Sequence, residues 1–206
     1  MNVAGLDAVT IDAYGTLLRL LDPVPALVDV LAERGVRRTP DVVLAGFEAE
    51  AAYYVPRVAE GENEAGLARL RRDSAGVFLD AVAADLDADE FAPVYVGAMR
   101  FEPIKGSVDA LRCLRALGLE FAVVANWDLS LRERLQEAGL AHFFSVVVHA
   151  ARKPSPDGLL HALGRLGVTP QRAVHIGDAG TDEAAARAAG MHFERAPLPD
   201  AIARLR

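Results

Sequence analysis

Residues 6–17 have the sequence LDAVTIDAYGTL, and this stretch sets the architecture expected for the whole chain. An apolar, β-branched run that leads into a Gly turn predicts a buried strand. The strand would deliver the carboxylate of Asp12 to its carboxyl end, where open α/β sheets bind their ligands. Asp12 is therefore a candidate nucleophile or metal ligand, with a helix N-cap as the alternative.

A second apolar stretch ends in the same way at residues 172–183, RAVHIGDAGTDE. Asp178 closes the predicted strand, and Asp182 follows four residues later, at the start of a helix predicted from 183 to about 189 with Gly190 as its stop. One acidic residue there would also complement the helix dipole. Because Mg²⁺ prefers oxygen ligands, we expect Asp12 and Asp178, from neighbouring strands, to converge on one ion.

Two further segments belong to the same predicted edge of the sheet. Residues 152–158, RKPSPDG, lie between a strand predicted over 145–149 and a helix predicted over 159–166, and the two prolines restrict the chain around Lys153. A cation fixed beside carboxylates can hold a phosphoryl group, whereas a Lys-Pro pair alone is usually a solvated loop. Residues 121–128, FAVVANWD, predict another buried strand that ends in polar side chains.

Taken together, these four segments resemble the haloacid dehalogenase-like hydrolase superfamily, and the resemblance covers the whole chain. It implies an α/β fold, with a Rossmann-like core built on a central parallel sheet and an inserted all-helical cap. The core would comprise residues 1–17 and 100–206, and the cap residues 18–99. Helical patterns at 25–34, from 39, at 64–86 and at 89–100 agree with such a cap, and no further strand is expected before Glu120.

The resemblance also implies roles for individual residues. Asp12 would be the attacking carboxylate, Lys153 would steady the negative charge of nucleophile and substrate, and Thr16 resembles the loop-stabilising Thr beside the substrate. The ligands implied for Mg²⁺ are Asp12, the backbone carbonyl of Tyr14, Asp178 and Asp182.

Two positions depart from the family pattern. Family phosphatases have a second Asp two residues after the nucleophile, which protonates the leaving alkoxide and then activates water; this chain has Tyr14. At Ala125 the family usually has a Ser or Thr that donates a hydrogen bond, which Ala cannot do. The sequence around Tyr14 resembles the L-2-haloacid dehalogenases most closely, whose halide leaves without a proton. Those dehalogenases need no metal and lack an acidic residue at the position of Asp178.

The departures leave three hypotheses. The first is a Mg²⁺-dependent phosphatase that acts on a small phosphorylated metabolite through an aspartyl intermediate on Asp12. The second is a metal-independent L-2-haloacid dehalogenase. The third, motivated by Tyr14 and Ala125, is a catalytically weak ligand-binding or regulatory protein on the same scaffold.

In addition to these roles, four residues are candidates for contact with the substrate. Arg57, in the predicted cap, is a candidate clamp for a carboxylate or phosphate, with a solvated surface residue as the alternative. Asn126 offers an amide N–H, and Trp127 either floors the pocket or packs against the adjacent helix. The phenol of Tyr14 can donate to a substrate oxygen.

Composition limits the remaining classes. The 206 residues carry 22 Lys and Arg against 29 Asp and Glu, a net charge of −7, and no basic face is evident, so nucleic acid is not an expected partner. A single cysteine, Cys113, excludes an intrachain disulfide and is expected to pack in the core. Neither a signal peptide nor a membrane span is expected. We therefore expect a cytoplasmic monomer or homodimer with a small-molecule substrate.

Overall fold

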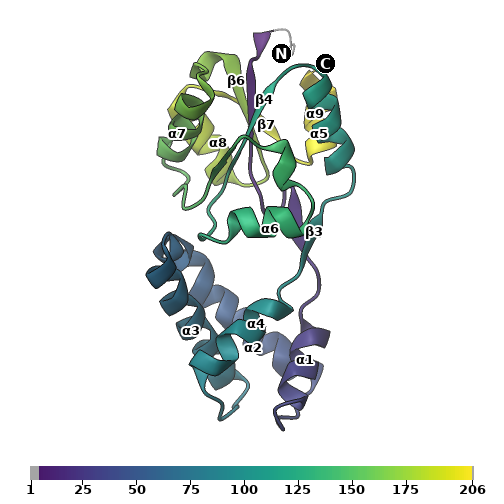
Figure 1. Ribbon diagram of the computed structural model, residues 1–206, viewed down its shortest axis with the longest axis vertical. Helices are drawn as coiled ribbons and strands as arrows, with labels where there is room; N and C mark the ends of the chain where they lie inside the picture. The colour runs from purple at the N-terminus through teal and green to yellow at the C-terminus, as the bar shows by residue number, and fades with distance from the viewer. Residues whose placement is uncertain (1–4, 206) are drawn as a thin grey trace. The chain divides into compact units, whose positions relative to one another are not determined.

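The computed structural model describes residues 5–205 and contains a five-stranded parallel sheet in the order β5-β4-β1-β6-β7 (Figure 1). This arrangement confirms the predicted α/β fold. The strands are β1 (Ala8–Ile11), β4 (Glu120–Val124), β5 (Val146–Val148), β6 (Ala173–Gly177) and β7 (His192–Arg195).

Helices cover both faces of this sheet. Alternate residues of a strand point to opposite faces, so Val9 and Ile11 pack into one apolar cluster while Ala8 packs into another. The first cluster includes residues of α5 (Ser107–Ala116) and α9 (Leu198–Leu205), and the second includes residues of α7 (Asp157–Leu166) and α8 (Gly180–Ala189). Figure 1 shows the two helix pairs on opposite sides of the strands. The remaining short elements here are α6 (Leu131–Glu137), η3 (Ala141–Phe143) and η4 (Pro170–Arg172).

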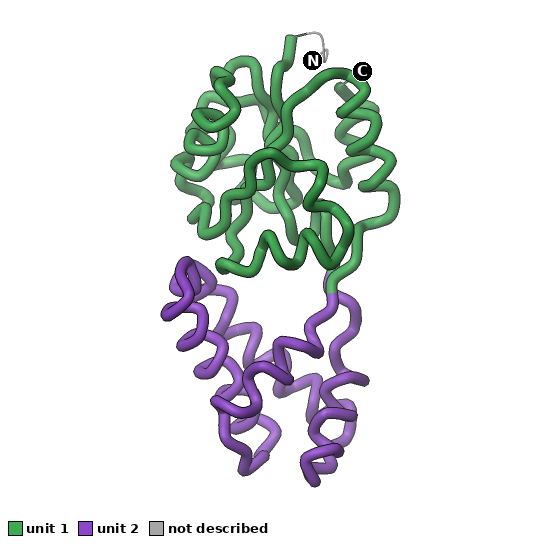
Figure 2. The backbone as a smooth tube through the Cα atoms, viewed as in Figure 1, with its two compact units in different colours: residues 1–19, 101–206 green, residues 20–100 purple. Residues whose placement is uncertain are grey.

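The chain divides into two compact units, residues 1–19 with 101–206 and residues 20–100 (Figure 2). In the part that the structure describes, the first unit contains the five-stranded sheet and the second is helical. The helices of the second unit are α1 (Val24–Ala32), α2 (Pro40–Tyr54), η2 (Val55–Gly61), α3 (Glu64–Ala81) and α4 (Ala88–Ala98). They enclose an apolar core of their own, which includes Phe78 and Phe91.

The expectation that no strand lies between Asp12 and Glu120 is wrong. A two-stranded ribbon forms from β2 (Leu18–Leu20) and β3 (Phe101–Pro103). Its flanks are held by hydrogen bonds from the N–H of Leu21 to the carbonyl of Arg100 and from Ile104 to Leu17, both 2.8–2.9 Å. Three residues are too few for an alternating pattern to show in the sequence.

Several helix boundaries differ from the predicted ones by a few residues; α1, for example, ends at Ala32 rather than at residue 34, and α7 begins at Asp157 rather than at residue 159. The helix predicted over 64–86 ends at Ala81, because Ala83 adopts a left-handed backbone conformation with φ of 50°. The last helix of the second unit ends at Ala98 rather than at residue 100. Helix α8 begins at Gly180 rather than at 183, which brings Asp182 inside its first turn.

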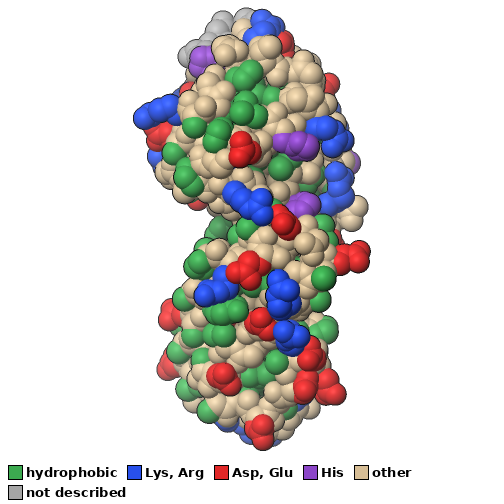
Figure 3. Space-filling model, turned by 90° about the vertical axis from the view of Figure 1, so that its left-hand side faces the viewer, with side chains coloured by type: hydrophobic (Ala, Val, Ile, Leu, Met, Phe, Trp, Pro, Cys, Tyr) green, Lys and Arg blue, Asp and Glu red, His purple; other side chains and the backbone are tan. Residues whose placement is uncertain are grey.

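The described surface carries both signs of charge. On the face drawn in Figure 3, basic and acidic side chains both occur on each unit. Among the helices of residues 5–205, none combines the length and the apolar character needed to cross a bilayer.

Candidate active site

The register of the sheet brings the ends of three neighbouring strands together. Ile11 pairs with Val123 of β4 on one side and with Ile176 of β6 on the other, and the N–H of Asp12 donates to the carbonyl of Ile176 at 2.9 Å. The chain runs outward from β1 through β4 to β5 on one side, then crosses back to β6 on the other side of β1 and continues outward to β7. Such a switch point is where open α/β sheets form their ligand sites.

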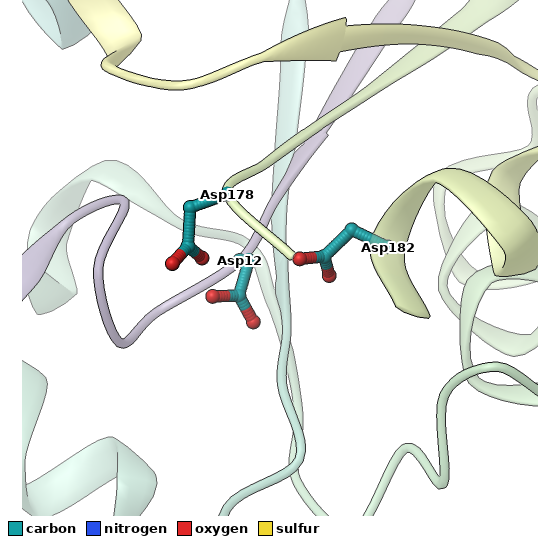
Figure 4. A group of neighbouring side chains, drawn as sticks. All are labelled: Asp12, Asp178 and Asp182. Carbon is teal, nitrogen blue, oxygen red and sulfur yellow. The ribbon is translucent and has the colours of Figure 1, made fainter. Parts of the chain in front are cut away.

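Three carboxylates converge at this switch point, as Figure 4 shows. Asp12 follows β1, Asp178 follows β6 and Asp182 lies in the first turn of α8; one oxygen from each lies within 4.8 Å of the others. Asp12 and Asp182 are buried, whereas Asp178 is exposed. Clustered carboxylate oxygens of this kind suit a hard divalent cation that keeps some of its water.

The turn after β1 fits tightly against Asp178. Gly15 has a φ of 81°, and a Cβ at this position would fall against the Asp178 carboxylate, so both the backbone angle and the space require glycine. The hydroxyl of Thr16 donates to Oδ1 of Asp178 at 3.4 Å. The structure therefore places Thr16 beside the acidic cluster, and the Tyr14 side chain, 56% exposed, on the surface.

Lys153 lies at the centre of the polar contacts. Its loop runs between β5 and α7, and its Nζ donates to Oδ1 of Asp12 at 2.5 Å, to the carbonyl of Val124 at 2.9 Å and to Oδ1 of Asp182. Lys153 as a whole residue is only 6% exposed, so its ammonium group is buried together with two carboxylates. A buried charge of this kind needs such partners, because desolvation is costly.

The surroundings shift the pKa values of the two buried carboxyl groups, Asp12 and Asp182, in opposite directions. Burial raises the pKa of Asp12 to about 6, against the opposing charge of Lys153. At neutral pH Asp12 is therefore mostly ionised, as a nucleophile must be. Burial would also raise the pKa of Asp182, but the hydrogen bond from His175 and the charge of Lys153 outweigh it and lower that pKa below its ordinary value.

A buried histidine supports Asp182, and the sequence analysis did not identify it. Nε2 of His175 lies 3.2 Å from Oδ1 of Asp182, and Nδ1 lies 2.8 Å from the hydroxyl of Thr10. Burial lowers the pKa of His175, which favours the neutral ring. Nδ1 also lies 3.1 Å from the carbonyl oxygen of Thr10. Since the Asp182 carboxylate only accepts, we assign the proton of the neutral ring to Nε2, and Nδ1 then accepts from the Thr10 hydroxyl. The available signal was a pair of polar residues in two otherwise apolar strands.

Two candidates in the strand-end segment have partners within the first unit. Asn126 exchanges two hydrogen bonds with the backbone of Lys153: its Nδ2 donates to the carbonyl at 2.9 Å and its Oδ1 accepts from the N–H at 2.8 Å. Trp127 is 8% exposed and packs with Phe101 of β3, with ring centroids 5.0 Å apart, and with Tyr14 at 6.5 Å. These ring contacts join Trp127 to a strand and to the turn after β1, and its role as the floor of a substrate pocket stays a prediction.

The remaining candidates lie elsewhere. In the second unit, Arg57 donates to the carbonyl of Tyr53 at 2.9 Å and its guanidinium lies 4.2 Å from the centre of the Tyr53 ring. Its role as a substrate clamp stays a prediction. Ala125 is buried, and its N–H donates to the carbonyl of Val148 at 3.0 Å. Cys113 on α5 is only partly buried.

The chain matches the family model of haloacid dehalogenase-like hydrolases over residues 6–190. It is 31% identical to the phosphoglycolate phosphatase of Pseudomonas putida over 127 residues, which are 59% of this chain and 42% of that protein. It is 39% identical to the phosphoglycolate phosphatase of Escherichia coli over 87 residues (40% of this chain, 34% of that protein). A match to haloacid dehalogenase-like hydrolase domain-containing protein 3 of Xenopus laevis has 40% identity over 94 residues (43% and 38%). The matched stretches thus span about two fifths or less of each relative.

Solved structures share the fold. The L-2-haloacid dehalogenase of Xanthobacter autotrophicus superimposes with a TM-score of 0.66 at 24% identity, over 92% of this chain and 77% of that chain. A haloacid dehalogenase-like family hydrolase of Deinococcus radiodurans, solved with bound phosphate and sodium, has a TM-score of 0.56 at 28% identity (93% and 81%).

Proposed function

Because the chain belongs to the haloacid dehalogenase-like hydrolase family, we propose that it is a Mg²⁺-dependent phosphatase acting on small phosphorylated metabolites. The observation that carries the proposal is the meeting of Asp12, Asp178 and Lys153 at one edge of the sheet. Oxygen donors for a cation and a buried ammonium group for a phosphoryl oxygen are two of the groups that stabilise charge in phosphoryl transfer. The curated relatives make 2-phosphoglycolate the first substrate to test.

The residues present suit a magnesium ion. The carboxylates of Asp12 and Asp178 and the backbone carbonyl of Tyr14 are the oxygen donors that would hold it, and the exposure of Asp178 leaves room for water ligands. When bound, Mg²⁺ supplies positive charge that offsets the charge on the transferring phosphoryl group. Asp182 already accepts from Lys153, His175 and the N–H of Ala179, so we assign it to Lys153 rather than to the ion.

The chain's own residues then perform two displacements. An oxygen of the Asp12 carboxylate bonds to phosphorus as the bond from phosphorus to the substrate's alcohol oxygen breaks, and the departing alkoxide takes a proton from water. Water next attacks the aspartyl-phosphate, which regenerates the carboxylate and releases inorganic phosphate. Throughout, the ammonium group of Lys153 stabilises negative charge on Asp12 and on the phosphoryl oxygens.

The test is a screen of phosphate monoesters, with 2-phosphoglycolate included, at saturating Mg²⁺. We expect phosphate release that requires Mg²⁺ and that is lost in Asp12→Asn, which keeps the size of the side chain but not the nucleophile. Release no faster than in the Asp12→Asn variant for every ester would refute the proposal. Trapping of the aspartyl-phosphate by mass spectrometry would locate the covalent step on Asp12.

A second candidate is dehalogenation of a short L-2-haloacid, favoured by the phenol of Tyr14 where a phosphatase has a second carboxyl group. Here the Asp12 carboxylate displaces halide from carbon, an ester forms, and water hydrolyses it. This reaction needs neither a metal nor a proton for the leaving group. It predicts chloride release from L-2-chloropropionate in the presence of EDTA, and no release under those conditions would exclude it.

A further inference from the structure

The Asn126 side chain continues the pairing of β4 with β5 beyond the ends of both strands. After the last ladder pair, the N–H of Ala150 donates to the carbonyl of Trp127 at 2.8 Å, and that of Ala151 to the carbonyl of Ala125 at 3.1 Å. The next contact is made by a side chain: the Asn126 amide forms hydrogen bonds with both the N–H and the carbonyl of Lys153. Only one orientation of the amide satisfies both hydrogen bonds, with Oδ1 towards the N–H and Nδ2 towards the carbonyl.

The loop to which Asn126 is hydrogen-bonded contains two residues in an unfavourable backbone conformation. Ala150 and Arg152 both adopt left-handed conformations, with φ of 47° and 54°. Residues with a Cβ rarely do so, and such conformations persist where the surrounding structure imposes them. Asn126 binds the residue that follows Arg152, so it is placed to hold the loop in this shape.

The shape of the loop decides where the Lys153 ammonium group lies. Nζ is buried and must reach Asp12, Asp182 and the carbonyl of Val124 at once. We expect a shift of the Lys153 backbone to weaken these contacts, because Nζ is already bound to three groups at the end of the side chain. The positions of the ammonium group and of the Asn126 amide are therefore linked through one residue's backbone.

We propose that Asn126 is a positioning residue, which acts on the reaction by holding Lys153 rather than by touching the substrate. The proposal rests on the proposed phosphatase function for its kinetic consequence, but its structural consequence is independent of any activity. Loss of the amide would release the loop at Lys153 and lower the fraction of molecules with the ammonium group in place.

The structural experiment is amide hydrogen exchange in the full chain, read on peptides that cover 150–153. We expect Asn126→Ala to speed exchange at the Lys153 amide by about tenfold or more, while the β1 and β6 peptides stay protected. Asn63→Ala is the matched control, because Asn63 also accepts a backbone N–H, that of Gly66 at 3.0 Å, but in the second unit. It should leave the 150–153 peptides unchanged. Unaltered exchange at Lys153 in Asn126→Ala would overturn the proposal, even if the protein had no phosphatase activity.

The kinetic experiment is a double-mutant cycle with Lys153→Met, which keeps most of the stem and removes the charge. If Asn126 acts through Lys153, Asn126→Ala lowers kcat by about tenfold in the parent and has no further effect in the Lys153→Met background. A direct contact with substrate predicts instead a raised KM with unchanged kcat, and effects that multiply in the double variant. That second result would overturn the positioning role. A wild-type protein without phosphate release would refute the proposed function and leave the exchange result to decide on Asn126.

Discussion

The hydroxyl of Thr10 is hydrogen-bonded to Nδ1 of His175 at 2.8 Å, and the two residues are register partners on β1 and β6. Both side chains are completely buried, and Nε2 of His175 forms a second hydrogen bond, with Asp182. A polar chain therefore runs from the interior of the sheet to the ion pair of Lys153. Each link gives a hydrogen-bond partner to a buried polar side chain, as buried polar groups require.

Breaking this chain should lower stability in graded steps. His175→Phe keeps the ring but removes a donor from Asp182 and the acceptor of the Thr10 hydroxyl, and we expect a loss of about 2 kcal/mol. Thr10→Val keeps the shape, removes one hydrogen bond and should cost about 1 kcal/mol. Urea denaturation followed by tryptophan fluorescence measures both, because Trp127 is the only tryptophan and lies in the first unit. Equal midpoints for wild type and His175→Phe would contradict the expectation.

Gly15→Ala should remove activity through a steric conflict. The new methyl group would meet the Asp178 carboxylate in addition to straining the backbone at φ of 81°, and we expect kcat/KM to fall by about a hundredfold. Gly118→Ala is the matched control, since Gly118 has φ of 76° and open space around its added Cβ. It should cost about 1 kcal/mol of stability and leave kcat/KM unchanged. Similar kinetics for the two variants would show that the contact with Asp178 is unimportant.

Local sequence patterns predicted which carboxylates lie at strand ends. The hydrogen-bond partners within the site depend on how distant segments pair in the folded chain. An apolar strand that ends in Asp at a Gly turn is visible in a dozen residues, so Asp12 and Asp178 are placed at strand ends without the structure. The pairing of Thr10 with His175 depends on two segments 165 residues apart. Likewise, an Asn after a strand can face a substrate or a neighbouring loop, and only the fold shows that Asn126 holds Lys153. The β2–β3 ribbon escaped notice because each strand has three residues.

The second unit should lose stability as pH rises, because of Glu50. This carboxyl group is 6% exposed and accepts from the Tyr95 hydroxyl at 3.0 Å. Burial raises the pKa of Glu50 above 4.5, although the hydrogen bond from Tyr95 opposes the shift. The folded state thus favours the protonated form, so this contribution is complete below pH 4.5 and is lost as pH rises through the raised pKa.

Glu50→Gln should remove that pH dependence, since the amide is neutral at every pH. Thermal unfolding of the full chain, followed by circular dichroism at several pH values, measures the change in Tm. Glu48→Gln provides the control, because Glu48 lies on the same helix α2 but is exposed. It should keep the wild-type dependence. If Glu50→Gln and wild type lose Tm in parallel with rising pH, the buried carboxyl group is not the cause.

Tyr14→Asp should improve phosphate release if the leaving-group proton limits the reaction. The added carboxyl group would stand two residues after Asp12, where it can protonate the alkoxide and then activate water, and general acid–base help of this kind is worth about 10²–10⁴-fold. The Tyr14 side chain is 56% exposed, so its replacement should leave the fold intact. Tyr14→Asn matches the size of the new residue without its acid. Steady-state kinetics on the best substrate should show a gain in Tyr14→Asp alone, and an equal gain in Tyr14→Asn would attribute the effect to lost bulk.

Replacement by Asn should affect mainly Mg²⁺ binding at Asp178 and mainly stability at Asp182. Asp178 is exposed, with the Thr16 hydroxyl at 3.4 Å, so Asp178→Asn should change stability by less than about 0.5 kcal/mol while weakening Mg²⁺ binding at least tenfold. Asp182→Asn leaves the buried Lys153 with one fewer counter-charge and should cost about 3–5 kcal/mol. Calorimetric titration with Mg²⁺ and urea denaturation measure the two effects on the same preparations, without recourse to a substrate. If Asp182→Asn weakened Mg²⁺ binding as much as Asp178→Asn and kept wild-type stability, Asp182 would be a metal ligand and its assignment to Lys153 would be wrong.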